Sequence, residues 1–185
     1  MRRYSARVPR LVLTVIGDDR AGLVSALASV VTDHGGNCEQ SQLAELAGKF
    51  AGIVTVELDP DRVGALTEAL AALEGSLETS VHEAGAAPTS ERESGDLVLE
   101  LVGNDRPGIV KEISAVLAAQ QVSVEDLQTK VVPAPQAGGD LFAAKVRLRA
   151  PASTDLSALR AALEELAAEL LVDLSFDSDD LPDWE

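Results

Sequence analysis

Two kinds of apolar spacing alternate along this chain, and the alternation occurs twice in the same order. Dense apolar runs such as residues 11–16 predict strands, whereas apolar residues that recur every three or four positions, as over residues 23–31, predict amphipathic helices. In each half the predicted order is strand, helix, strand, strand, helix, strand. Residues 37–43 are polar enough to predict a strand at the edge of its sheet.

The predicted elements follow one another closely in both halves. In the first half we expect strands over residues 11–16, 37–43, 49–58 and 77–83. In the second half we expect strands over residues 96–102, 123–132, 140–149 and 170–176. Helices are expected after the first and third strand of each half. Because every helix has a single apolar face, both helices of a unit should cover one face of a four-stranded antiparallel sheet, with strand order 4-1-3-2.

The first strand and helix of each half share the motif Gly-x-Asp-Arg-x-Gly, at an offset of 86 residues. The match has no gap and continues through the helix into the second strand. Such an ordered match is an internal repeat, so the chain contains two copies of one small unit. At the same offset, Leu27 and Ile113 should occupy equivalent core positions. The motif residues correspond as Gly17 with Gly103, Asp19 with Asp105, Arg20 with Arg106, and Gly22 with Gly108.

The motif can be interpreted as a turn that accepts a ligand. Gly17 supplies backbone angles that other residues avoid, Asp19 stands where a helix N-cap acceptor is wanted, and Gly22 has no Cβ to hinder close approach. Pro107 of the second copy is expected in the first helical turn. The N–H groups of the helix start suit a carboxylate, and Asp19 suits an ammonium group, so together they match a free amino acid. The plainer alternative is that Asp only caps the helix and Gly only eases packing.

Composition and charge narrow the class of protein. Of the 185 residues, 46% are hydrophobic, 25% are charged and 3% are aromatic, which fits globular domains with aliphatic cores. The formal net charge of −16 would repel a phosphate backbone, and the sequence has no zinc-finger, leucine-zipper or convincing helix-turn-helix motif. Direct binding to nucleic acid is therefore not expected.

No pattern in the sequence supports catalysis, a metal site or a bound cofactor. His34 and His82 stand in no motif with a nucleophile, and no spacing of His and Cys suits a metal. Asp18 and Asp19 are adjacent and their side chains diverge, so they do not form an acid/base pair. A Gly-rich phosphate loop with a lysine is also missing. We therefore expect a protein that is not an enzyme.

Cysteine usage and hydropathy predict a cytoplasmic protein that makes no membrane contact. The single Cys38 excludes an intrachain disulfide, and we expect it in a strand as a small core residue. The basic N-terminus is followed by an apolar run that is too short for a signal peptide. No stretch reaches the length of a transmembrane helix.

The composition also changes between segments, which predicts the domain boundaries. We expect a first domain over residues 10–84, a linker over residues 85–95, a second domain over residues 96–177 and an acidic tail over residues 178–185. The linker contains Gly, Pro, Ser and charges without apolar periodicity. The tail is either solvated or binds a partner through Trp184.

The first strand of each unit carries apolar residues on both faces, whereas the helices of the unit cover only one. Val12 and Ile16 in the first unit, and Val98 and Val102 in the second, are expected on the face without helices. A contact that removes these side chains from water predicts a homodimer or a higher assembly. Packing of the two units within one chain is the alternative.

Each unit combines the order β-α-β-β-α-β with Asp-Arg-x-Gly between the first strand and the first helix. Over about residues 11–177 this combination resembles the ACT domain, a ferredoxin-like sensor of small molecules. The tandem arrangement is similar to the glycine cleavage system transcriptional repressor family, on the basis of residues 17–24, 36–44 and 49–50. The implied fold class is α+β, with two tandem ferredoxin-like units.

The resemblance implies that an amino acid binds at an interface between two units. Ligand groups in ACT domains come from the loop after the first strand and from the start of the second strand. Asn37 suits the second position, whereas its counterpart Ser123 departs from the pattern, so the second unit either binds weakly or serves as architecture. Ligand-binding ACT domains often have Asn where Asp19 and Asp105 stand here. The implied ligand-binding residues are Asp18, Asp19, Arg20, Gly22, Leu23, Asn37, Asn104, Asp105, Arg106, Gly108 and Ile109.

Three functions are compatible with these features. The first is a regulator that senses an amino acid, with glycine or serine as the first candidates, and acts through a protein partner in transcriptional control of glycine or one-carbon metabolism. The second is a detached regulatory subunit of an amino-acid metabolic enzyme. The third is a protein–protein scaffold with an empty site. Ligand calorimetry separates the third from the others, and identification of the partner separates the first two.

Overall fold

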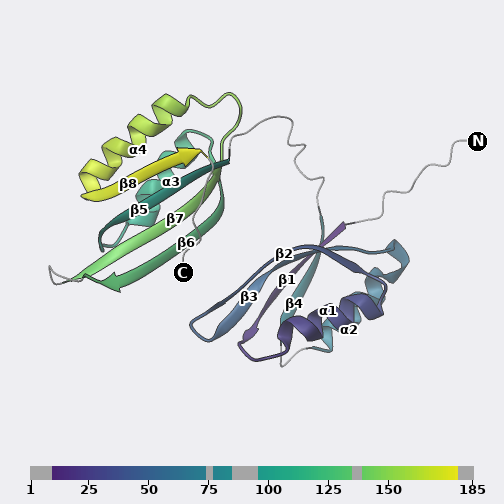
Figure 1. Ribbon diagram of the computed structural model, residues 1–185. Helices are drawn as coiled ribbons and strands as arrows, with labels where there is room; N and C mark the ends of the chain where they lie inside the picture. The colour runs from purple at the N-terminus through teal and green to yellow at the C-terminus, as the bar shows by residue number, and fades with distance from the viewer. Residues whose placement is uncertain (1–9, 74–76, 85–95, 135–138, 179–185) are drawn as a thin grey trace, which may run out of the picture. The chain divides into compact units, whose positions relative to one another are not determined.

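The structure is a computed structural model that describes residues 10–73, 77–84, 96–134 and 139–178. The chain divides into two compact units, residues 1–89 and residues 90–185. Each unit is a four-stranded antiparallel sheet with two α-helices on one face (Figure 1), so the predicted fold class is confirmed. The expected linker, residues 85–95, and all but the first residue of the expected tail, residues 178–185, lie outside the described residues.

The first unit has the strand order β2-β3-β1-β4, so β2 and β4 are its edges. This is the predicted order, and the polar second strand occupies an edge as expected. The elements are β1 Arg10–Asp18, α1 Leu23–Asp33, β2 Asn37–Leu46, β3 Lys49–Glu57, the 3-10 helix η1 Pro60–Arg62, α2 Val63–Ala71 and β4 Glu78–Glu83.

The second unit repeats this topology with the strand order β6-β7-β5-β8. Both second strands shift register at equivalent places, between Cys38 and Gln40 and between Val124 and Asp126, so a β-bulge is part of the repeat. The elements are β5 Asp96–Asn104, α3 Ile109–Ala119, β6 Ser123–Pro133, β7 Asp140–Arg149, α4 Leu156–Leu170 and β8 Val172–Ser178.

Each core lies between a sheet and its own pair of helices. In the first unit the buried faces of β1 and β3, such as Leu13 and Val56, pack against α1 and α2. Leu27 and Ile113 are buried in their respective cores, as the repeat predicts. Burying an aliphatic side chain of this size contributes roughly 1.5–3 kcal/mol, so these faces account for much of the stability of each unit.

On each sheet, the face without helices is exposed and only partly apolar. Ile16 and Val102 are exposed there, as predicted, and Val12 is half-buried. Val98 was also expected to be uncovered, but it is buried. On the second sheet this face carries charge, because the Lys145 ammonium lies 3.7 Å from a Glu100 carboxylate oxygen.

Three further points concern Cys38, His34 and membrane-spanning helices. Cys38 is exposed and not in the core, because it lies on the edge strand β2. His34 is half-buried, and its ring nitrogen Nδ1 lies 2.7 Å from the Val30 carbonyl oxygen. Within the described ranges, no helix is both long and apolar enough to cross a membrane.

Candidate ligand site

The loop between β1 and α1 is fastened to the hairpin turn that joins β2 to β3. That turn has Ala47 and Gly48 in left-handed conformations, with φ of 53° and 77°, as a tight two-residue hairpin requires. The Asp19 N–H donates a hydrogen bond of 2.9 Å to the Gly48 carbonyl. In the second unit the Asp105 N–H donates to the Asp140 carbonyl at the same distance. Both loops are thus fixed at the same backbone position.

The residue that caps each helix is glycine and not aspartate. Gly22 and Gly108 are the N-cap residues, with φ of 94° and 101°, and neither helix has a side-chain cap. The expectation that Asp19 and Asp105 cap the helices is wrong, because they lie three residues before the cap and face solvent. The plainer alternative, in which the aspartate serves only as a cap, is wrong for the same reason.

The glycines that end the first strands have ordinary backbone angles. Positive φ occurs at the two N-cap glycines and not at Gly17 or Gly103, so the expectation for these strand ends is wrong. Gly103 serves packing, since a Cβ there would lie 2.4 Å from Cγ1 and 2.8 Å from Cα of Val172 on β8. Pro107, expected inside the helix, precedes the N-cap of α3. Within the motif, only the last glycine, Gly22 or Gly108, has a backbone conformation that favours glycine.

The electrostatics of the first loop are set by one ion pair and one uncommitted cation. Asp18, at the end of β1, forms an ion pair with Lys49, which lies opposite it in the β1–β3 register. The hydrogen bond from Lys49 and its charge lower the pKa of Asp18 below the ordinary value, and Arg20 adds a smaller contribution in the same direction. Within the described chain the Arg20 guanidinium makes no hydrogen bond or ion pair. Its charge is therefore available to an incoming anion.

The second loop already holds a carboxylate at the equivalent place. The Arg106 guanidinium donates to both carboxylate oxygens of Glu112, at 2.7 Å and 3.2 Å. The Glu112 carboxylate also lies beside the N-cap of α3, because a Cβ on Gly108 would be 3.2 Å from Oε1. The corresponding residue of the first unit is Ala26, and α1 has no acidic residue in its first turn. The two loops therefore have the same backbone conformation, but only the second has an acidic side chain at the start of its helix.

Asn37 begins β2 at the opposite end of the sheet from the loop. It pairs with Glu57, which in turn pairs with Arg10 at the start of β1, whereas the loop follows Asp18 at the end of β1. A strand of nine residues spans roughly 25 Å, so Asn37 and the loop do not meet within one unit. The topology explains the separation, because α1 returns the chain to the end where β1 began. A ligand that touches both places would need two units, as the resemblance implies.

The remaining predicted residues differ in what they can offer to a ligand. Leu23 and Ile109 are buried as the first residues of their helices, so only their backbone groups can face a ligand. Asn104 is exposed at the end of β5, opposite Leu141 in the register. Within the described ranges, no group of three or more His, Cys, Asp or Glu side chains is placed to hold a metal ion.

Two residues that shape the loops were not identified from the sequence. Lys49 faces Asp18 only because of the strand register, and the tight turn at Ala47 and Gly48 was the available signal. Glu112 lies in the first turn of its helix, where the helix dipole favours an acidic side chain. Comparing it with Ala26 at the repeat offset would have revealed the difference between the loops.

Comparisons with known proteins find the same kind of domain in both units. A sequence model of the ACT domain matches residues 9–83 and residues 95–177, one match for each unit. Over 163 residues the chain is 26% identical to the glycine cleavage system transcriptional repressor of Escherichia coli (strain K12), which covers 86% of this chain and 85% of that protein.

Solved structures give the same result for the fold. The crystal structure of an uncharacterised protein from Galdieria sulphuraria superimposes with a TM-score of 0.83 and 28% sequence identity, covering 93% of this chain and 99% of the other. A second crystal structure, of a protein provisionally assigned as a glycine cleavage system transcriptional repressor, has a TM-score of 0.67 and 19% identity. It covers 92% of this chain and 98% of that chain, and at this identity it supports the fold alone.

Proposed function

This chain belongs to the ACT-domain family, and on that premise we propose that it senses a small free amino acid and passes the signal to a protein partner. The observation that carries the proposal is the repeated loop, in which a left-handed glycine begins a helix whose first turn in the first unit carries no acidic side chain. The similarity to a transcriptional repressor of the glycine cleavage system supports a non-catalytic role in the control of glycine or one-carbon metabolism inside the cell.

We place the amino acid in the first unit, at the loop between β1 and α1. Its carboxylate would face the first N–H groups of α1, beginning after Gly22, and would pair with the Arg20 guanidinium. Its ammonium group would meet the exposed Asp19 carboxylate, while Asp18 remains paired with Lys49. Contacts between charged partners of this kind are about twice as strong as neutral hydrogen bonds, so this site favours a zwitterion.

The second unit is proposed to serve as architecture. Glu112 already supplies a carboxylate to Arg106 and to the start of α3, so a ligand carboxylate would have to displace it. Ser123 in place of Asn37 points in the same direction. Asn37 itself could touch a ligand bound at the loop only if another protein molecule supplied it.

Glycine and serine are the first ligands to test, and a protein is the expected partner. A net charge of −16 disfavours direct contact with DNA, so a signal to transcription would pass through another protein. Coupling between ligand and partner sites typically amounts to about 1–3 kcal/mol. Self-association as a homodimer is part of the proposal, because Ile16 and Val102 remain exposed on the faces without helices.

Calorimetry with the common amino acids tests the site directly. The wild-type chain should release or absorb heat with at least one small amino acid, and Asp19→Ala should weaken that binding. Ala26→Glu gives the first loop the carboxylate of the second, and it should abolish binding. Arg106→Ala is the matched control and should leave binding unchanged. Heat that persists in Ala26→Glu, or the absence of heat with every amino acid, would contradict the proposed site.

A further inference from the structure

The face of the first sheet that carries no helices is almost uncharged, although the chain as a whole has a net charge of −16. In the three central cross-strand rows of this face, only Glu78 carries a charge at neutral pH. Read from β2 through β3 and β1 to β4, the rows are Gln40, Thr55, Val12 and His82; Gln42, Ile53, Thr14 and Ser80; and Ala44, Ala51, Ile16 and Glu78. Covering this face would therefore remove little charge from water.

Aliphatic side chains form the centre of this face. Ile53 is 46% exposed and Ile16 is 48% exposed. In the β1–β3 register Ile53 lies opposite Thr14, so it is diagonal to both Val12 and Ile16, at a spacing of roughly 7–8 Å. The three aliphatic side chains thus lie close to one another. An exposed apolar patch of this kind, surrounded by polar residues, is typical of a surface that binds another protein.

The equivalent face of the second sheet has a different character. Lys145 lies opposite Glu100 on that face, as Ile53 lies opposite Thr14 on the first. Further charged residues of the corresponding rows are Asp126, Arg147, Lys130 and Asp173. The two units have the same strand order here, so the uncharged face is a property of the side chains of the first unit.

The charges around the first face favour a basic partner. Both cations at its ends, Arg10 and Lys49, are already paired with carboxylates. Within the described part of the chain, the carboxylates of Glu57 on β3 and Glu78 on β4 form no ion pair or hydrogen bond. A partner with Lys or Arg beside an apolar stripe would cover the aliphatic centre and neutralise these two carboxylates. A second copy of the same face would bring two more carboxylates instead, so it fits less well.

The shape of this surface also indicates what it can bind. It is the broad face of a sheet, and the opposite face of the same sheet already packs against α1 and α2 through aliphatic side chains (Figure 1). A sheet face with this spacing of side chains therefore accepts a helix. Ile16 lies two residues before Asp18, where the loop between β1 and α1 begins, so a helix bound on this face would lie next to that loop.

We propose that the helix-free face of the first sheet is the docking surface for the protein partner, and that the partner presents an amphipathic helix with an aliphatic stripe flanked by lysine or arginine. The inference rests on the proposed function for the existence of a partner, but it does not depend on the amino-acid site.

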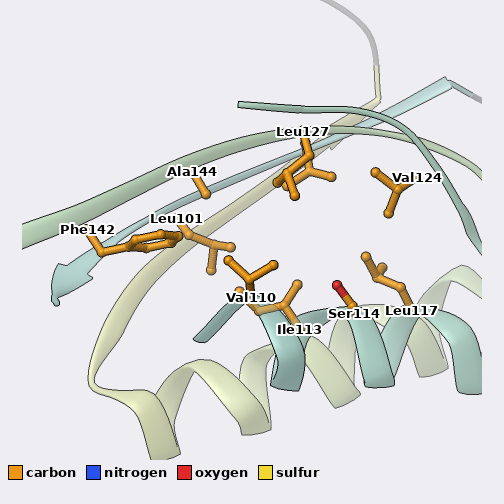
Figure 2. A pocket seen from close by; sticks show the side chains of 10 residues that line it. Leu101, Val110, Ile113, Ser114, Leu117, Val124, Leu127, Phe142 and Ala144 are labelled. Atoms are coloured by element: carbon orange, nitrogen blue, oxygen red, sulfur yellow. The ribbon is translucent and has the colours of Figure 1, made fainter. Parts of the chain in front are cut away.

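The second unit offers a different apolar surface, which supplies the control. A groove between β6 and α3 encloses about 280 Å³ of space that is open to solvent. Figure 2 shows Val124 and Leu127 of β6 on one side of the groove, with Val110 and Ser114 of α3 on the other. Leu127 is 43% exposed, close to the 46% of Ile53. Leu127→Glu therefore makes in the second unit the same kind of change that Ile53→Glu makes in the first.

Peptide binding to the full-length chain tests the surface and the chemistry of the partner. The probe is a synthetic peptide of about 18 residues of leucine, alanine and lysine, with every leucine on one face of the helix. The control peptide has the same composition, with the leucines distributed around the helix. In an NMR titration the first peptide should bind and shift the backbone amide resonances of β1 and β3, and the control should bind at least about tenfold more weakly.

Ile53→Glu separates docking on this face from general charge attraction. The added negative charge would strengthen a purely electrostatic attraction to a lysine-rich peptide, whereas on this face it would place a carboxylate against the leucines. Ile53→Glu should therefore weaken binding at least about tenfold, and Ile53→Ala should weaken it less. Leu127→Glu should leave it unchanged.

Equal binding of the two peptides, unchanged binding to Ile53→Glu, or resonance shifts confined to α3 and β6 would each overturn the proposal. A loss of self-association in Ile53→Glu, measured by sedimentation velocity without peptide, would also overturn it, because the face would then belong to a second copy. Amide spectra like that of the wild type establish that both Ile53 variants are folded. Amino-acid calorimetry on Ile53→Glu reports separately on the loop, so failure of the docking surface and failure of the amino-acid site are distinguishable.

Discussion

Truncating one equivalent side chain in each core tests the packing of the two units separately. Leu27 and Ile113 occupy the same position in α1 and α3, and they are 3% and 5% exposed. Leu27→Ala and Ile113→Ala both shorten the side chain by the same number of carbon atoms. The difference between the two variants therefore reports on the surroundings and not on the size of the change.

The expected losses follow from burial and from the space left behind. At about 0.8 kcal/mol for each buried CH2 group, the transfer term is roughly 2–3 kcal/mol for either variant. Leu27 lies within the first core, so its removal also leaves a cavity, and the total loss should be about 3–5 kcal/mol. Ile113 lines the groove between β6 and α3, so the vacated space opens to that groove. The unfolding free energy lost in Ile113→Ala should therefore be about 2–3 kcal/mol.

Hydrogen exchange followed by mass spectrometry can assign each loss to its unit. Two units need not unfold in one transition, so a single denaturation curve would mix their stabilities. Leu27→Ala should lower the protection of peptides from α1 and β3, and Ile113→Ala should lower that of peptides from α3 and β7. A loss below about 1 kcal/mol for both, or a clearly larger loss for Ile113→Ala, would refute the assignment of the helix faces and of the groove.

Three further predictions concern charge and backbone space. Because Lys49 lowers the folded-state pKa of Asp18, the pair stabilises the protein fully above the unfolded-state pKa and loses this effect as the pH falls through the folded value. Asp18→Asn should thus be less stable than wild type at neutral pH and equally stable in strong acid, as urea denaturation over a pH series would show. Gly103→Ala should cost about 1–3 kcal/mol in denaturation experiments, because its Cβ would collide with the backbone of Val172. Gly64→Ala, with nothing within 4 Å of the added Cβ in α2, should instead raise stability by up to about 1 kcal/mol; the opposite signs would contradict the packing described.

The fold could be predicted from the sequence because its signals are local and occur twice. Apolar spacing identified the strands and helices, and the gapless repeat required both units to adopt one topology. The exposed strand β2 was recognised by its polarity. Cys38 was misjudged because it is exposed on an edge strand, and the position of a strand within its sheet is not revealed by the spacing of residues.

The candidate site was predicted less well, because it depends on directions and on contacts between distant residues. Asp19 was assigned a capping role from its residue type, whereas the left-handed Gly22 begins the helix. Asn37 was joined to the loop by analogy with ligand sites between two units, and within one unit the topology places it at the other end of the sheet. The hydrogen bond from Arg106 to Glu112 makes the two loops chemically different. It depends on one position of the repeat, which is Glu112 in the second unit and Ala26 in the first.

The most direct measurement is a titration of isotope-labelled protein with glycine or serine, followed through the backbone amide resonances of Gly22 and Gly108. The two residues have the same conformation and the same place in the repeat, so each is the control for the other. Binding at the first loop should shift the Gly22 resonance in a saturable manner, and the Gly108 resonance should stay in place because Glu112 already lies there. A saturable shift at Gly108 alone, or no shift at either glycine with any amino acid, would contradict amino-acid sensing by the first unit.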